Sequence, residues 1–265
     1  MRSGSKNLTW TFLLLCPLFL IASESFAIIL HPSGEPDLSS WVDRPDPNVF
    51  GRWRSNASCV AVSRNCVVTT RHQGGSTGQV VIGGSTYNIG QIWDHNDADL
   101  RVVKLQNANL AHFVELYADT NETGKEIVIG GYGKGRSSIL QNLGTTYGYT
   151  RDSAGNSTLR LCTNKINSTG VAGDSYTSNI IVADFDGLNE GDSTVYEGTI
   201  AAYDSGGGWF TKDGSIWKLA GLSRLQVYIL KRVTKAIPII IFMRRGFETG
   251  PIPQHFSLII LMRCV

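Results

Sequence analysis

Short runs of alternating or continuous apolar residues recur along most of this chain, and clusters rich in Gly, Ser and Asn separate them. Examples are the runs at 57–62, 66–70, 79–82 and 86–89, each four to six residues long. Val, Ile, Thr and Tyr dominate these runs, and such residues favour β-strands when turn residues bound them. The pattern therefore predicts an all-β protein built from many short strands.

Composition sets limits on the class of protein. The 265 residues are 42% hydrophobic and 17% charged, which is enough for one large or two small β units with a buried core. The net charge of +2 gives no argument for a nucleic-acid partner. There is no Cys-x-x-Cys pair, and the acidic stretch at 184–192 lacks the spacing of an EF-hand, so we expect no metal and no cofactor.

The first 27 residues have the pattern of a cleavable export signal. Arg2 and Lys6 give a basic start, the run 13–22 is apolar, and the small residues Ser25 and Ala27 flank Phe26. The alternative is a membrane anchor, but the apolar run is shorter than the ~20 residues that a span needs. We therefore expect cleavage after Ala27 and a secreted or periplasmic protein that does not stay at the membrane.

Two residues at predicted strand ends are candidates for acid–base chemistry. His72 follows the apolar run 66–70, and Asp99 directly precedes the alternating run 100–105. Side chains at strand ends are held by the sheet and still reach a cleft. His72 has a plain alternative as a polar residue at the end of a strand. Asp94, Asp97 and His95 are close competitors, which we interpret as solvated loop residues.

The stretch from Tyr203 to Gly208 reads Tyr-Asp-Ser-Gly-Gly-Gly and contains the candidate nucleophile, Ser205. Glycines beside a serine let the backbone approach a ligand closely and leave N–H groups available to a developing oxyanion. The alternative is an ordinary glycine-rich turn between two strands. The motif becomes more specific because His72 and Asp99 precede it in the chain.

These motifs, in this order, resemble those of the trypsin/chymotrypsin-like serine peptidases. The similarity covers 57–223 and also includes the strand-like segments 126–133 and 218–223. It implies two six-stranded antiparallel Greek-key barrels with the active site between them. The first barrel would span about 28–118 and the second about 119–223.

The resemblance also implies a role for each site residue. Ser205 would be the nucleophile, His72 the general base and Asp99 the residue that orients it. The backbone N–H groups of Tyr203 and Ser205 would form the oxyanion hole, and Asp204 would accept the α-amino group of Ile28 after signal cleavage. Thr199 and Ser223 would line the specificity pocket, where the uncharged Thr199 argues against a strong preference for Arg or Lys. The expected function is a secreted serine endopeptidase that cleaves polypeptides through an acyl-enzyme.

Three features depart from the family pattern. Gln73 follows the histidine where a cysteine often stands, Tyr203 replaces a glycine, and residues 224–265 do not match. That tail could be an altered reading frame, a sticky extension or a divergent last pair of strands. Without the closing strands the second barrel would be incomplete, with an open edge. The alternatives are therefore a catalytically impaired, peptidase-like binding module, or an unrelated secreted β-protein in adhesion. The sequence does not indicate an oligomeric state.

Overall fold

The structure is a computed structural model that describes residues 28–31, 36–142, 145–153, 157–173, 175–187, 191–228 and 255–261. The expected export signal, residues 1–27, lies outside the described residues. Strands dominate, and the described helices are two 3-10 turns, η1 (Pro47–Val49) and η2 (Arg71–Gln73). Within these ranges, no helix is long and apolar enough to cross a membrane.

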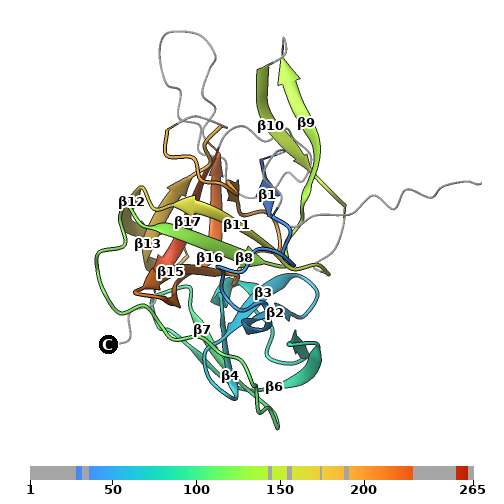
Figure 1. Ribbon diagram of the computed structural model, residues 1–265. Helices are drawn as coiled ribbons and strands as arrows, with labels where there is room; N and C mark the ends of the chain where they lie inside the picture. Colours follow the sequence, from blue (N-terminus) through green and yellow to red (C-terminus); the bar gives the residue numbers. More distant parts are fainter. Residues whose placement is uncertain are drawn as a thin grey trace, which may run out of the picture.

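The first unit is a closed barrel of six antiparallel strands, drawn in blue and teal in Figure 1. Its strands are β2 (Phe50–Trp53), β3 (Ala57–Ala61), β4 (Cys66–Thr69), β5 (Gln79–Ile82), β6 (Ser85–Asp94) and β7 (Arg101–Leu105). They follow each other around the barrel in the order β2-β3-β4-β7-β6-β5. Along β7 the buried Val103 and Leu105 flank the exposed Lys104, which is the two-residue period of a half-buried strand.

The second unit contains a seven-stranded antiparallel sheet in the order β11-β8-β15-β16-β17-β13-β12. Its strands are β8 (Glu126–Gly131), β11 (Arg160–Lys165), β12 (Ser168–Gly173), β13 (Thr177–Asp184), β15 (Gly208–Asp213), β16 (Ile216–Tyr228) and β17 (His255–Leu261). Two smaller pairs accompany it (Figure 1): the hairpin of β9 (Arg136–Asn142) and β10 (Thr145–Arg151), and β1 (Ile29–Leu30) with β14 (Gly198–Thr199).

The expected all-β, double-barrel fold is confirmed, and the C-terminal segment contributes to it. Strand β17 lies between β16 and β13, and the backbone of Ile259 is paired with Ser223 on one side and with Ile181 on the other. Of the three interpretations of residues 224–265, a divergent last strand agrees with this pairing. The second unit therefore has seven strands in its sheet rather than the six expected for a barrel.

A shared apolar core joins the two units. Phe50 of β2 packs against Phe210 of β15 with ring centroids 5.0 Å apart. Both rings are buried with Val60, Val128 and Leu222 in one cluster that takes residues from both units. Such burial stabilises by roughly 25 cal/mol per Å² of apolar area removed from water. The two units are thus packed as one body, and groups that face each other across this junction are held in fixed positions.

Gly130 of β8 tests how tightly this junction is packed. A Cβ atom at this position would overlap the ring of Phe50 and the side chain of Leu161, which cannot move freely in a filled core. We expect Gly130→Ala to lower the free energy of unfolding by about 1–3 kcal/mol. Thermal unfolding followed by circular dichroism measures this loss.

Gly170→Ala is the matched control. Gly170 lies exposed on β12, where the nearest atoms to a new Cβ would be those of Ile180 at 3.7 Å. We expect this variant to unfold within about 0.5 kcal/mol of the parent chain. Equal melting temperatures for the two variants would contradict a tightly packed junction at Gly130.

Candidate active site

The pairing of β4 with β7 brings His72 and Asp99 together. Thr69 at the end of β4 lies opposite Arg101 at the start of β7, so the residues just after β4 meet those just before β7. His72 lies in the 3-10 turn η2, three residues beyond Thr69. Two residues that lie at strand ends in the sequence, His72 and Asp99, are thus brought into contact by the pairing of their strands.

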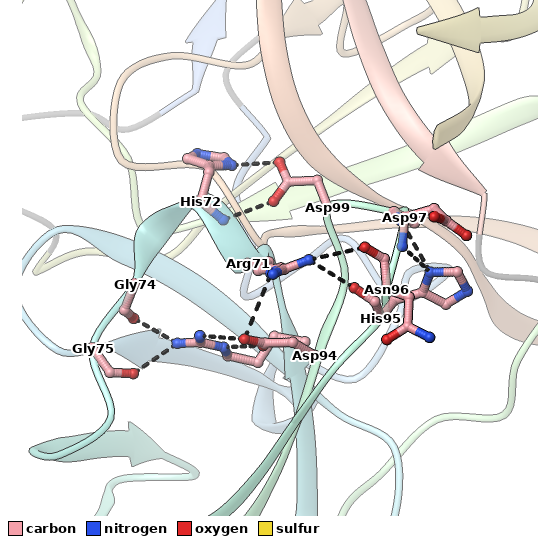
Figure 2. A network of polar contacts seen from close by, with 11 residues as sticks. Arg71, His72, Gly74, Gly75, Asp94, His95, Asn96, Asp97 and Asp99 are labelled. Carbon is pink, nitrogen blue, oxygen red and sulfur yellow. Dashed lines mark hydrogen bonds and ion pairs between the residues drawn. The ribbon is translucent and has the colours of Figure 1, made fainter. Parts of the chain in front are cut away.

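Two hydrogen bonds lock the histidine onto the carboxylate (Figure 2). The Nδ1 atom of His72 lies 2.5 Å from Oδ2 of Asp99, and the backbone N–H of His72 donates to Oδ1 at 2.7 Å. Asp99 is fully buried, and the His72 side chain is 20% exposed. A carboxylate accepts, so Nδ1 carries a proton, and in the neutral form of the ring the lone pair lies on Nε2, which points away from Asp99.

Ser205 reaches the histidine from the second unit. It lies in the loop between β14 and β15, and its carbonyl accepts a hydrogen bond of 2.8 Å from the N–H of Ser58 on β3. Its Oγ lies 3.2 Å from Nε2 of His72. The structure therefore brings together the three predicted catalytic side chains, which come from both units.

The glycines after Ser205 are required by close packing. Gly206 has φ +82°, and a Cβ atom there would overlap the carbonyl of Ser58 and the hydroxyl of Thr69. A Cβ atom on Gly207 would overlap the carbonyl of Gly130. The loop can lie against β3 and β8 only because these side chains are absent.

The competing acidic residues belong to a separate network, also shown in Figure 2. Asp94 accepts hydrogen bonds of 2.6 and 2.9 Å from Arg101, and these bonds lower the pKa of its carboxyl group. His95 is exposed, and its Nδ1 accepts the N–H groups of Asp97 and Ala98. The solvated-loop interpretation fits His95 and Asp97, whereas Asp94 is exposed but ends strand β6 and is ion-paired with Arg101.

Asp204 is a buried carboxylate surrounded by backbone donors. The N–H of Gly133 lies 2.7 Å from Oδ1, the N–H of Ala201 lies 2.8 Å from Oδ2, and the N–H of Ile28 also donates to this group. Burial outweighs these bonds and raises the pKa of Asp204 to about 7. Ile28 itself is fully buried, so the residue that would become the chain start already lies beside the carboxylate predicted to receive it.

Tyr203 adopts a backbone conformation that side chains disfavour. Its φ is +74°, in the left-handed region that glycine adopts readily and in which other residues are strained. Its carbonyl accepts from the Ser58 hydroxyl at 3.1 Å, and Lys134 lies over its ring. Among the described residues, the N–H groups of Tyr203 and Ser205 donate to no protein acceptor. Their role as an oxyanion hole stays a prediction.

The two predicted pocket residues are both fully buried. Thr199 lies in β14 opposite Ile29 of β1, and the hydroxyl of Ser223 accepts a hydrogen bond of 3.1 Å from the indole of Trp209. Thr199 precedes the nucleophile loop in the sequence, and Ser223 follows it. Their part in substrate selection stays a prediction.

Sequence reasoning missed two residues that touch the site. Arg224 donates from Nε to Oδ2 of Asp99 at 3.0 Å, and its side chain is only 4% exposed. The register of β16 against β17 shifts between Ser223 and Leu225, and such irregularities re-aim side chains. Gln73 lies with its side-chain nitrogen 2.6 Å from Nε2 of His72. The departure at Gln73 was visible in the sequence; Arg224 is the first residue of the unmatched tail and gave no signal.

The described part of the chain contains both possible metal ligands and thiols. In the described ranges, no three His, Cys, Asp or Glu side chains are grouped so that they could hold a metal ion. Cys59, Cys66 and Cys162 are free thiols, and burial raises the pKa of Cys59 and of Cys162. A buried thiol with a raised pKa is a poor nucleophile.

Two solved structures of one protease share the fold of this chain. No family model and no curated protein matches the sequence. The chain is similar in structure to the Rv3671c protease from M. tuberculosis in its active form, with TM-score 0.52 and 14% identity, over 90% of this chain and 87% of that one. The inactive form of the same protease matches with TM-score 0.50 and 13% identity, over 87% and 93%. Neuropsin, a serine protease of mouse brain, matches with TM-score 0.47 and 16% identity, over 81% and 90%.

The structural similarity concerns the fold. Sequence identities this low do not show what the protein does. The closed six-stranded barrel, the seven-stranded sheet packed against it and the likeness to the two Rv3671c structures point the same way. This chain has the double-barrel fold of the trypsin/chymotrypsin-like serine peptidases.

Proposed function

We propose that this protein is a secreted or periplasmic serine endopeptidase that cleaves polypeptides through an acyl-enzyme. The observation that carries the proposal is the chain of contacts from Asp99 through His72 to Ser205, with distances of 2.5 and 3.2 Å. The double-barrel fold supports it, because His72 and Asp99 come from the first unit and Ser205 from the second.

Each of these residues would take one part in the reaction. His72 removes the proton from Ser205 through Nε2 while Oγ attacks the peptide carbonyl, and it then gives this proton to the leaving amine. Asp99 holds the imidazole in the tautomer that leaves Nε2 unprotonated, and stabilises the imidazolium as it forms. The free N–H groups of Tyr203 and Ser205 would then stabilise the oxyanion.

We further propose that removal of the export signal activates the protein. The α-ammonium group created at Ile28 would lie beside Asp204, which already accepts the Ile28 N–H. The new ion pair would hold the turn that contains Ser205. No separate activation segment is then needed.

A fluorophosphonate probe tests the nucleophile. Attack by Oγ of Ser205 forms an O–P bond and releases fluoride, while His72 takes up the serine proton. We expect the chain that starts at Ile28 to be labelled, and Ser205→Ala to lose labelling completely. Intact-mass spectrometry measures the added group.

Ser58→Ala is a control for simple loss of serine. Ser58 lies close to the same loop, and its hydroxyl donates to the carbonyl of Tyr203. We expect the Ser58→Ala chain to be labelled still at Ser205, at a reduced rate if loss of this hydrogen bond lets the loop move. A folded chain that is not labelled would contradict the enzyme and favour the peptidase-like binding module. That alternative has specific support in the strained Tyr203 and in the contact of Gln73 with His72.

The chain start provides a second prediction. Retaining Ala27 before Ile28 replaces the α-ammonium with a neutral amide, so the carboxylate of Asp204 loses its counter-ion. We expect the rate of labelling to fall by at least about tenfold, the factor that corresponds to 1.4 kcal/mol. Equal rates for the two chains would overturn activation by signal removal.

The same pair of chains should differ in the pH dependence of stability. In the chain that retains Ala27, the pKa of Asp204 is about 7 when folded and near 3.8 when unfolded. The folded state then binds the extra proton between about pH 4 and 7, so its stability falls as the pH rises through this window. In the chain that starts at Ile28, the α-ammonium favours the carboxylate, and this loss disappears.

Melting temperatures between pH 4 and pH 7.5 measure this difference. The gap between the chains should widen with pH, toward an upper limit of about 4 kcal/mol. Glu197, whose pKa burial also raises to about 7, affects both chains equally and cancels in the comparison. Asp204→Asn should close the gap. Parallel curves for the two unmodified chains would argue against the ion pair.

A further inference from the structure

Two donors face one lone pair at the proposed base. With the proton on Nδ1 held by Asp99, the neutral imidazole of His72 offers a single acceptor, the lone pair of Nε2. The hydroxyl of Ser205 lies 3.2 Å from this nitrogen, and the side-chain nitrogen of Gln73 lies 2.6 Å from it. One lone pair accepts one strong hydrogen bond, so the closer donor, Gln73, holds it.

The orientation of the Gln73 amide follows from its surroundings. Its oxygen accepts from the side-chain amide of Asn56 at 3.4 Å. Turning the amide over would point its oxygen at the lone pair of the neutral His72, and two acceptors repel each other. The nitrogen therefore faces His72 as long as the imidazole is neutral, which is the form in which Nε2 can act as a base.

We propose that Gln73 is a positioning residue that restrains the base in the free protein. This inference rests on the proposed function, since it concerns the proton transfer from Ser205 to His72. While the Gln73 N–H occupies Nε2, the Ser205 hydroxyl has no acceptor for its proton. The amide must move away from Nε2 before the serine becomes nucleophilic.

The restraint also lies in the path of the leaving group. The proton that Nε2 takes from Ser205 is later given to the leaving amine, which must therefore approach the same nitrogen. Gln73 occupies this approach. A substrate that extends past the cleaved bond displaces the amide as it binds, whereas a small probe has to wait until the amide leaves by itself.

Removal of the donor tests the proposal. Gln73→Met keeps a flexible side chain of similar length without an N–H. We expect this variant to react with a small fluorophosphonate about 3- to 10-fold faster than the parent chain, the range that one hydrogen bond of ordinary strength corresponds to. Gln79→Met, on the exposed start of β5, is the matched control and should not change the rate.

A reading independent of reactivity comes from nuclear magnetic resonance. In Ser205→Ala, where no probe can react, the Gln73 side-chain amide proton should resonate downfield of the other glutamine amides. Additional replacement of His72 by Ala should return it to the ordinary range. This shift reports the hydrogen bond itself, whether or not the protein proves to be an enzyme.

The outcomes separate the two proposals. A parent chain that is labelled, with Gln73→Met at an equal or slower rate, overturns the restraint and leaves the peptidase intact. A parent chain that is never labelled overturns the peptidase. In that case the amide resonance decides the restraint: a displaced signal supports the hydrogen bond, and an ordinary one refutes it. If Gln73→Met does not fold, the same resonance decides.

Discussion

The buried carboxylate of Asp204 is the constraint on which the rest of the site depends. Its three backbone donors come from the start of the described chain, from the segment after β8 and from the segment after β14. A buried carboxylate is costly unless such donors surround it. These donors therefore fix the turn that presents Ser205. The turn belongs to the second unit, whereas His72 and Asp99 are held by the first. Loss of any of these contacts would move the nucleophile relative to its base.

Local pattern in the sequence was enough to find the residues at strand ends. The positions of His72 and Asp99 at strand ends could be predicted because β4 is a continuous apolar run and β7 has an alternating one, and the residues that bound these runs follow from them. The motif around Ser205 could be predicted because close backbone packing requires glycine, and the glycines after Ser205 can be read directly in the sequence. Side-chain packing between the units, such as Phe50 on Phe210, depends on distant parts of the chain and could not be predicted.

The features that the sequence did not reveal depend on tertiary structure: the direction in which a side chain turns and the pairing of distant strands. Whether Gln73 turns toward His72 or toward solvent is decided by χ angles that no local pattern encodes. Whether β17 pairs with β16 depends on contacts between residues that lie 27 to 40 positions apart, from Tyr228 with His255 to Gly221 with Leu261. Tyr203 is intermediate: its departure from glycine was visible, but its positive φ required the fold.

The contact between Arg224 and Asp99 changes how a substitution at the aspartate should be interpreted. The guanidinium is almost entirely enclosed, and the carboxylate it faces is enclosed as well. An alanine at position 99 would deprive the imidazole of its orienting group and also leave a permanent positive charge in a poorly solvated place, which is destabilising in its own right. An inactive variant of this kind would combine a chemical and a folding defect. Separating them calls for a change that neutralises both partners together.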